Sequence, residues 1–379
     1  MNGPRVAIVH ERFTCLAGSE RVVEQLHALW PDAVIHSPLV DTAALPPGLA
    51  RADVRCSSLQ RLYRGGSGYA HLLPFLPAAV ARLDLSGADV VITSHHAFAN
   101  RVRRHAATPV VSYTHSPARW MWEPAFLAGE PGGTMGRAML SAFARTQRGP
   151  DRAAARAAEV IVANSRHVAK RIRSWWGRDA VVVPPPVDVD LFTPSLDVAR
   201  EPFFLFAGRL VPYKRPLVAV EAAKRAGVRL VVAGDGRMRA AVEAAARPGI
   251  DVVGYVNDVS LRDLYRRCQA LVFPGEEDFG IVPVEAQACG APVLARAVGG
   301  VLDSVIDGRT GRLYDPRGPT DEVDALAAAM RSFDAGSFDA DVLRRHAEGF
   351  SREAFRARFA AAAAPAFARF GRPAGVEVA

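Results

Sequence analysis

The residues best suited to chemistry are two carboxylates, Glu277 and Glu285, which are separated by seven residues. Pro283 suits the first turn of a helix, where its missing N–H group costs little. Gly290 suits the residue that follows the end of that helix. We therefore expect Glu277 on a loop and Glu285 on the first turns of a helix, with both side chains able to accept hydrogen bonds from a ligand.

The triplet Phe279, Gly280 and Ile281 between these carboxylates is typical of a tight turn that enters a helix. The first backbone N–H groups of such a helix have no partner within it, and they attract phosphate. An acidic side chain beside a phosphate site cannot also bind the phosphate, so we expect both carboxylates to bind hydroxyl groups. The stretch therefore predicts a ligand that carries a diphosphate with a sugar on either side.

Two cations, Arg209 and Lys214, follow the apolar segment 203–207. This segment reads as a buried strand, and α/β folds place ligands at the carboxyl ends of their strands. Arg offers a bidentate fork and Lys a point charge, and both suit phosphate oxygens. A basic surface loop is the alternative interpretation, but the carboxylates downstream favour a phosphate site.

Taken in order, these motifs resemble those of the retaining glycosyltransferases of family GT4, also called group 1 glycosyltransferases, which have the GT-B fold. The resemblance covers most of the chain and is carried by the Glu-x7-Glu pattern with Phe-Gly-Ile inside it and by four further segments, 206–215, 231–236, 253–256 and 307–311.

The resemblance implies roles for these residues. Glu285 would bind the ribose hydroxyls of a nucleotide, and Glu277 would bind hydroxyls of the donor sugar. The triplet 279–281 would present backbone N–H groups to the diphosphate and the sugar. Arg209 and Lys214 would stabilise the departing diphosphate.

Five further residues are matched to the family with weaker signals. Tyr255 and Val256 would lie at the edge of the nucleobase, although an apolar pair after a strand is most often core. His115 matches a family histidine that contacts the donor sugar. Gly18 is the best candidate in the glycine-rich first loop, where many relatives carry a Gly-Gly pair and this chain has Ala17 before the glycine. That departure leaves open whether Gly18 contacts phosphate or acceptor.

Short apolar segments alternate with helical patterns, which predicts α/β domains with parallel, doubly wound sheets. The GT-B resemblance implies two Rossmann-like domains facing a central cleft. We expect an acceptor-side domain at 1–190, joined by a C-terminal helix at 351–371, and a nucleotide-sugar domain at 200–350. A proline-rich stretch separates them, and Pro365 should kink or break the last helix. The expected strands are 6–9, 34–36, 90–93, 110–113, 160–163, 181–183, 203–207, 230–233, 251–253, 270–273 and 292–295.

Composition narrows the classes of protein. The four cysteines lack metal-ligand spacing. The Asp188-Val189-Asp190 sequence falls in the proline-rich stretch, and we reject it as a metal site for that reason. No metal or other cofactor is therefore expected. No signal-type segment and no run of about 20 apolar residues is present, which indicates a cytoplasmic protein. A dehydrogenase is disfavoured, since the turn at Gly234 lacks the third glycine of a dinucleotide fingerprint.

Charge is uneven along the chain. Residues 1–200 carry 23 Lys and Arg against 16 Asp and Glu, whereas residues 201–379 carry 24 against 23. One interpretation of the basic half is peripheral contact with the inner face of a membrane, because four tryptophans lie in it between residues 120 and 176. A solvated Arg-rich surface is the other. Nucleic acid is not expected, because no RNP, zinc-finger or stacking-platform pattern is present.

These observations predict transfer of a sugar from a nucleotide-diphosphate donor to a glycan, a glycolipid or a lipid-linked acceptor, with retention. GDP-mannose is the first donor to consider, because the region around His115 and the segment 212–216 resemble mannosyltransferases. His95 and His96 are candidates for the acceptor side. Two alternatives remain, a non-hydrolysing sugar-nucleotide epimerase of GT-B type and a non-catalytic protein that binds a sugar nucleotide or a membrane surface.

Overall fold

The computed structural model describes residues 3–124, 126, 133–195, 197–316, 318 and 321–370 of the 379-residue chain. By contacts between residues, the chain divides into two compact units. Unit 1 contains Met1–Pro186 and Phe355–Ala379, and unit 2 contains Val187–Ala354. The division falls at Pro186, so the segment that follows it belongs to unit 2, and Val187, Val189 and Phe192 are buried in the core of that unit.

Unit 1 is built on a parallel sheet of seven strands in the order β3-β2-β1-β4-β5-β6-β7. Side chains alternate between its two faces: Ile8 packs on one face, and Ala7 and Val9 pack on the other. Both faces are covered, which is why the strands read as nearly continuous apolar runs. The strands are β1 (Val6–His10), β2 (Val34–Ser37), β3 (Val54–Cys56), β4 (Val90–His95), β5 (Val110–Thr114), β6 (Val160–Ala163) and β7 (Val181–Val182).

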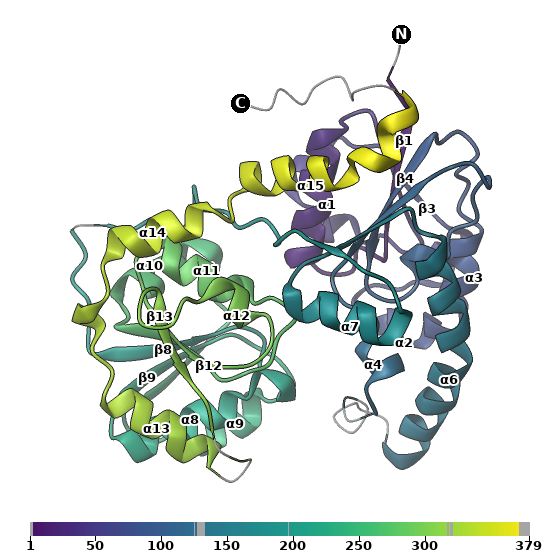
Figure 1. Cartoon of the computed structure of the whole chain (residues 1–379). Helices are drawn as coiled ribbons and strands as arrows, with labels where there is room; N and C mark the ends of the chain where they lie inside the picture. The colour runs from purple at the N-terminus through teal and green to yellow at the C-terminus, as the bar shows by residue number, and fades with distance from the viewer. Residues whose placement is uncertain are drawn as a thin grey trace. The chain divides into compact units, whose positions relative to one another are not determined.

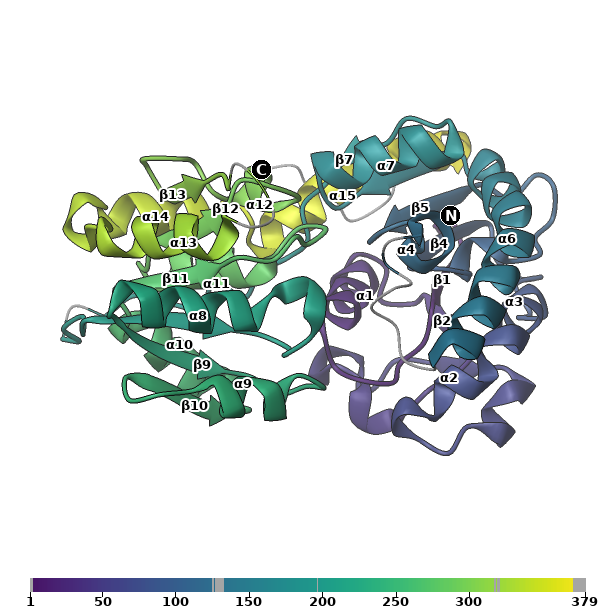
Figure 2. The same ribbon diagram turned by 90° about the horizontal axis from the view of Figure 1, so that it is seen from below.

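Helices cover the two faces of this sheet in separate groups (Figures 1 and 2). Helices α1 and α15 share one hydrophobic core with the sheet, which includes Val22 and Phe359. Helices α3, α6 and α7 share the other, which includes Val80, Ala155 and Ile172. The helices are α1 (Gly18–Leu29), α2 (Tyr69–Leu72), α3 (Leu76–Ala81), α4 (Arg119–Trp122), α6 (Gly133–Ala157), α7 (Arg166–Trp176) and α15 (Arg352–Phe367).

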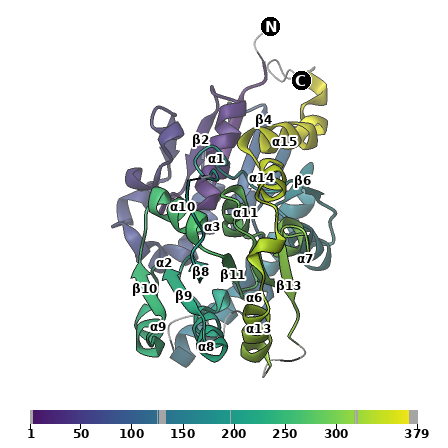
Figure 3. The ribbon, with the colours of Figure 1, turned by 90° about the vertical axis from the view of Figure 1, so that its left-hand side faces the viewer.

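Unit 2 repeats the pattern with six parallel strands in the order β10-β9-β8-β11-β12-β13. Figure 3 shows neighbouring strands of this sheet with α8 and α9 on one side and α10 and α11 on the other. The strands are β8 (Phe203–Ala207), β9 (Arg229–Ala233), β10 (Ile250–Gly254), β11 (Ala270–Phe273), β12 (Val293–Arg296) and β13 (Gly311–Tyr314).

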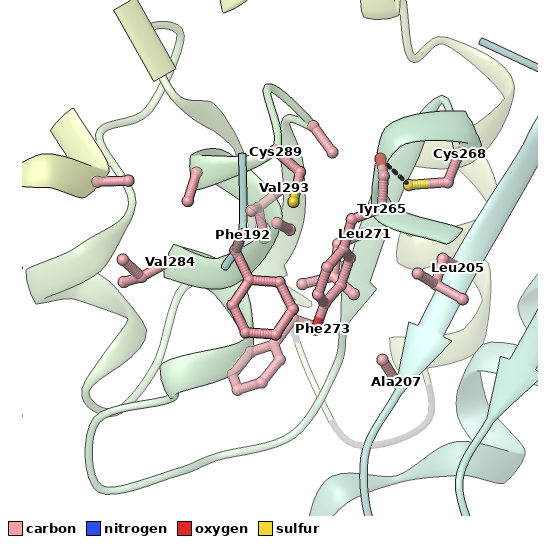
Figure 4. Close-up of a cluster of buried hydrophobic side chains, with 14 of the residues drawn as sticks. Phe192, Leu205, Ala207, Tyr265, Cys268, Leu271, Phe273, Val284, Cys289 and Val293 are labelled. Atoms are coloured by element: carbon pink, nitrogen blue, oxygen red, sulfur yellow. Dashed lines mark hydrogen bonds between the residues drawn. The ribbon is translucent and has the colours of Figure 1, made fainter. Parts of the chain in front are cut away.

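The helices of unit 2 also form two groups. Helices α10, α11 and α14 pack over the core that contains Leu205, Leu271 and Phe273, part of which is drawn in Figure 4. Helices α8, α9 and α13 pack over the opposite core. The helices are α8 (Pro216–Ala226), α9 (Arg239–Ala245), α10 (Asp258–Arg267), α11 (Ile281–Ala288), α12 (Val301–Ser304), α13 (Glu322–Arg331) and α14 (Ala340–Glu348).

The predicted fold class, two doubly wound Rossmann-like domains, is confirmed. The sequence did not indicate β3, which is a short edge strand whose Arg55 and Cys56 are exposed, nor β13. Of the two expectations for Pro365, a kink or a break, the break is wrong, because α15 continues through Pro365 to Phe367. Across the described residues no helix combines the length and apolar character needed to cross a membrane. The last residue of the expected helix at 351–371 lies outside those residues.

Candidate active site

In both sheets the candidate residues lie at the carboxyl ends of strands, next to the point where the strand order reverses. In unit 2 that point lies between β8 and β11, which pair directly, and the loops that contain Lys214 and Glu277 follow these two strands. In unit 1 it lies between β1 and β4, and His115 follows the next strand, β5. Ligands of open α/β sheets bind at such switch points.

The two loops of unit 2 bring Lys214 and Glu277 into direct contact. Nζ of Lys214 lies 2.5 Å from Oε1 of Glu277. Only 11% of the lysine side chain and 18% of the glutamate side chain are exposed. Because the pair is mostly shielded from water, each charge needs the other or a ligand of matching charge. A phosphate oxygen at Nζ and a hydroxyl at the carboxylate would satisfy both groups equally well.

Arg209 lies on the same loop with its side chain exposed. Its guanidinium donates to the hydroxyl of Tyr213 at 3.3 Å. The loop between the two cations ends in a short 3₁₀ helix, Pro212–Lys214, after which Arg215 adopts a left-handed conformation with φ of 55°. Arg215 also forms an ion pair with the buried Glu322 at the start of α13. This pair anchors the chain directly after Lys214.

The loop that carries Glu277 is held by close backbone contact with Gly300. The N–H group of Gly300 donates to the carbonyl of Glu277 at 2.8 Å. A Cβ atom on Gly300 would lie 2.2 Å from the carbonyl oxygen of Asp278, so no larger residue fits there. This close approach is the physical reason for a glycine at position 300.

Helix α11 begins as predicted. Gly280 is the residue that precedes it, with φ of 86°, a conformation that favours glycine. Phe279 is 3% exposed and packs in the core against Phe350, while Ile281 is partly buried against the same core. Their side chains therefore hold the turn in place, and only their backbone groups are placed to meet a ligand. Gly290 follows the helix with φ of 78°.

Glu285 lies on α11 and is only partly exposed. Its Oε2 accepts a hydrogen bond of 3.1 Å from the hydroxyl of Tyr265 on α10. Tyr265 is fully buried among Phe192, Leu271 and Phe273 (Figure 4). Burial and the neighbouring carboxylate raise the pKa of Tyr265 well above its ordinary value, so it remains a donor. Sequence analysis missed this residue, since a tyrosine within a helix gives no signal.

Tyr255 and Val256 lie in different surroundings. Tyr255 directly follows β10 and is 78% exposed, so its ring is available to a planar ligand. Val256 is partly buried against the hydrophobic core.

The described residues contain no group of three or more His, Cys, Asp and Glu that could hold a metal ion. Asp188 instead forms an ion pair with Arg352 and accepts from the N–H of Leu191.

In unit 1 the glycine-rich loop is held by hydrogen bonds to Glu20. Oε2 of Glu20 accepts hydrogen bonds of 2.9 Å from the N–H of Ala17 and from the hydroxyl of Ser19. Gly18 is the first residue of α1 and is partly exposed. Ala17 has φ of −144°, which any residue adopts, so the replacement of the family's first glycine costs no backbone strain here.

His115 belongs to a line of buried hydrogen bonds, which we call the histidine chain and which consists of Glu20, His10, Ser94 and His115. Oε1 of Glu20 lies 3.3 Å from Nε2 of His10. Nδ1 of His10 lies 3.0 Å from the hydroxyl of Ser94, which lies 2.8 Å from Nε2 of His115. Burial and the nearby His10 lower the pKa of His115 to about 3, so its imidazole is neutral at physiological pH.

His96 and Glu11 support this arrangement. The ring of His96 stacks on that of His115 with centroids 4.4 Å apart. Burial and His115 hold the pKa of His96 well below its ordinary value. Glu11 is 1% exposed and accepts backbone N–H groups of residues 96–99, which fixes the loop after β4. Sequence analysis missed Glu11 and the histidine chain, although an acid directly after the first strand is a signal worth testing.

Two models of glycosyltransferase families match this chain. The model of Glycosyltransferase Family 4 matches residues 16–191, and the model of Glycosyl transferases group 1 matches residues 191–336. The matches adjoin, and each falls mainly on one unit. The chain therefore belongs to the group 1 glycosyltransferases of family 4, as the motifs indicated.

Curated relatives agree with this assignment. The chain is 36% identical over 228 residues to the D-inositol 3-phosphate glycosyltransferase of Geodermatophilus obscurus, and 34% identical over 229 residues to that of Kribbella flavida. Each match covers 52% of this chain, and the matched stretch spans about half the length of these relatives, 50% and 54%.

Among solved structures, Anabaena Alr3699/HepE in complex with UDP and glucose aligns with a TM-score of 0.66 at 18% identity, covering 95% of this chain and all of that one. Sucrose-phosphate synthase from Thermosynechococcus elongatus aligns with a TM-score of 0.67 at 18% identity, covering 96% and 100%. At this identity the likeness shows the shared GT-B fold.

Proposed function

We propose that this protein transfers a hexosyl group from a nucleotide-diphosphate sugar to a hydroxyl group of a glycan, glycolipid or lipid-linked acceptor, with retention of anomeric configuration. The observation that carries the proposal is the Lys214–Glu277 contact, where a cation and a carboxylate meet beside the N-terminus of α11. A nucleotide-diphosphate sugar offers one phosphate oxygen and one sugar hydroxyl at adjacent positions, and these two groups match the pair.

The proposal assigns the departing diphosphate to unit 2. Cleavage of the bond between the anomeric carbon and the phosphate oxygen leaves negative charge on the diphosphate and positive charge on the sugar. Lys214, Arg209 and the N–H groups at the start of α11 would stabilise the diphosphate as that charge develops. Fixed donors of this kind are worth about 3 kcal/mol each where they have been removed from enzymes.

The proposal assigns recognition of hydroxyl groups to the carboxylates. Glu285 would bind the ribose, held in place by Tyr265. Glu277 would bind the donor sugar once Lys214 turns to phosphate. His115, neutral at physiological pH, would exchange a hydrogen bond with a hydroxyl of the sugar rather than supply a charge. We propose no protein nucleophile, so the acceptor hydroxyl would attack on the face that the phosphate leaves and would give its proton to that phosphate.

The motifs do not identify the donor sugar or the acceptor, so both are to be found by experiment. GDP-mannose remains the first donor to test, because the segment around His115 resembles mannosyltransferases. UDP sugars are second, because Alr3699/HepE was solved with UDP and with UDP-glucose. Inositol phosphates belong among the acceptors, because relatives at 34–36% identity are named D-inositol 3-phosphate glycosyltransferases.

The decisive experiment is thermal stabilisation by GDP, UDP, ADP and their sugars, measured for the wild type, Glu285→Ala and the matched control Glu243→Ala. Glu243 lies on α9 and pairs with Arg239 at the surface. We expect one nucleotide to stabilise the wild type and the control but not Glu285→Ala. Equal stabilisation of all three proteins would show that Glu285 does not bind the nucleotide, and no stabilisation by any nucleotide would reject the function.

Product analysis then separates transfer from its alternative. Incubation of the donor with acceptors, followed by NMR of the product, should give a glycoside with the anomeric configuration of the donor. An inverted glycoside would overturn the mechanism. An epimerised sugar nucleotide formed without any acceptor would replace transfer by epimerisation.

We also propose that turnover needs no metal, since Arg209 and Lys214 supply the positive charge that a diphosphate requires. Full activity in EDTA is expected, and a loss restored by manganese would contradict it.

Peripheral attachment to an anionic membrane through the basic part of unit 1 is a separate proposal. Co-sedimentation with phosphatidylglycerol vesicles that is lost at high salt would support membrane attachment. An absence of binding to the vesicles at low salt would reject it.

A further inference from the structure

The histidine chain has a definite direction because of its first member. Glu20 is 4% exposed. Burial alone would raise the pKa of Glu20, but the hydrogen bonds that its carboxylate accepts, first that from His10, outweigh it and the pKa is lowered, so Glu20 is a carboxylate at neutral pH. A carboxylate only accepts hydrogen bonds. Nε2 of His10 must therefore carry a proton.

The direction passes along the chain by the hydrogen-bonding capacity of each group. In a neutral imidazole one nitrogen donates and the other accepts. With Nε2 of His10 protonated, its Nδ1 accepts the hydroxyl proton of Ser94 at 3.0 Å. The oxygen of Ser94 then accepts from Nε2 of His115 at 2.8 Å. The N–H groups of the two histidines and the hydroxyl of Ser94 each have an acceptor. Nδ1 of His115 is left without a proton.

The far end of the chain is consistent with this direction. Within the described part of the protein, Nδ1 of His115 has no hydrogen-bond partner, and it is not among the fully shielded polar atoms that lack one. His115 is 9% exposed. A bare Nδ1 therefore reaches the surface, where it is available to a ligand.

We propose that Glu20, His10 and Ser94 are positioning residues that set His115 as its Nε2–H tautomer. Through this chain the start of α1 decides which kind of hydrogen bond His115 offers. His115 then presents Nδ1 as an acceptor, so it receives a hydrogen bond from a donor hydroxyl and does not donate one. This role for His115 toward a sugar rests on the proposed function, whereas the tautomer itself does not.

Glu20→Gln provides a reversal test. Ala17 N–H and Ser19 both donate to Oε2 of Glu20, so in the variant the amide oxygen occupies that place and the amide NH₂ faces His10. Nε2 of His10 then accepts, Nδ1 donates to Ser94, and Ser94 donates to Nε2 of His115. His115 is forced to carry its proton on Nδ1. Glu24→Gln, on the same helix and bonded to Gly48, is the matched control.

The experiment is NMR of the full chain labelled with ¹⁵N-histidine, in which long-range ¹⁵N–¹H correlations identify the protonated nitrogen, with His115 assigned by its loss in His115→Gln. We expect Nε2–H in the wild type and in Glu24→Gln, and Nδ1–H in Glu20→Gln. A wild type with Nδ1–H, or a Glu20→Gln spectrum unchanged from the wild type, would overturn the proposal. If Glu20→Gln does not fold, the wild-type spectrum alone decides.

Kinetics then test the consequence. Ser94→Ala breaks the chain, and we expect kcat to fall about fivefold with little change in KM, as for one lost hydrogen bond. Ser94→Thr keeps a hydroxyl and should recover most of that loss. Ser112→Ala is the control, since Ser112 is equally buried and its hydroxyl bonds to that of Thr114, outside the histidine chain. Equal losses in Ser94→Ala and Ser112→Ala would reject the link. The NMR result stands even if the protein shows no glycosyl transfer.

Discussion

The carboxyl edge of the sheet in unit 1 and that in unit 2 differ in charge, although the strand orders of the two sheets correspond. In unit 2 the loops after β8 and β11 present an ion pair, Lys214 with Glu277, and an exposed Arg209. In unit 1 the loops after β1, β4 and β5 present stacked histidines whose pKa values are depressed. The parallel sheet fixes where a site can form, and the loops decide whether it meets charge or hydroxyl groups.

Burial explains the difference. His10, Ser94 and His95 are 0% exposed, so a charge there would lose its hydration. Hydrogen bonds along the histidine chain satisfy the polar atoms of His10 and Ser94. The pair in unit 2 keeps some contact with water and can be reopened by a ligand. If the two edges are specialised in this way, variants in unit 2 should affect binding of a charged group, and variants in unit 1 should affect hydroxyl recognition and sensitivity to pH.

The largest expected effect is that of Lys214→Ala. Removing a cation that stabilises a leaving diphosphate should lower kcat by about 10²- to 10³-fold. The control is Lys224→Ala, because Lys224 pairs with Glu221 on the surface of α8. A loss below tenfold, measured with saturating donor, would show that unit 2 does not act through this charge.

A second prediction concerns the pH dependence of stability in unit 1. The folded-state pKa of His115, about 3, lies below the unfolded value near 6.5. The stability contributed by its neutral form is therefore complete above the unfolded pKa and is lost as pH falls below it. Between pH 7 and pH 5.5 this one histidine should cost about 1 kcal/mol of unfolding free energy.

The measurement is urea unfolding followed by tryptophan fluorescence. All five tryptophans, at positions 30, 120, 122, 175 and 176, belong to unit 1, so the signal reports that unit alone. His115→Gln should show a smaller pH dependence than the wild type. Parallel pH profiles for the two proteins would contradict the neutral state of His115.

Tyr265→Phe should have a smaller effect. It removes the hydroxyl that donates to Glu285, and we expect the Kd for the preferred nucleotide to rise about fivefold, as for a loss near 1 kcal/mol. Tyr314→Phe is the matched control, because Tyr314 is also buried but its hydroxyl has no hydrogen-bond partner among the described residues. Calorimetric titration of both variants checks this, and equal affinities would mean that Glu285 needs no support.

The smallest effect is expected for Ala17→Gly, which restores the family's glycine pair. Because φ of Ala17 is −144°, the glycine releases no strain and only adds freedom to the unfolded chain. We expect the unfolding free energy to change by less than about 0.5 kcal/mol and kcat to stay the same. A clear gain in kcat would show that the side chain of Ala17 obstructs the ligand.

Much of the fold could be predicted from local pattern. The mostly apolar runs at 90–93 and 203–207 predict strands buried on both faces, and the turn before Ile281 requires glycine whatever surrounds it. The edge strand β3 could not be predicted, because an exposed strand needs no apolar run. A break at Pro365 did not occur, because packing of Phe359 and Phe367 against the core of unit 1 outweighs the local cost of a proline within α15.

For the site, the sequence by itself determined which side chains are ionisable, their order along the chain and the helix start between Glu277 and Glu285. Only the tertiary structure decided their partners. Lys214 and Glu277 are 63 residues apart, and Ser94 bonds to residues 84 and 21 positions away. Such contacts are fixed by strand order and register, which join the carboxyl ends of distant strands, and no local propensity encodes them.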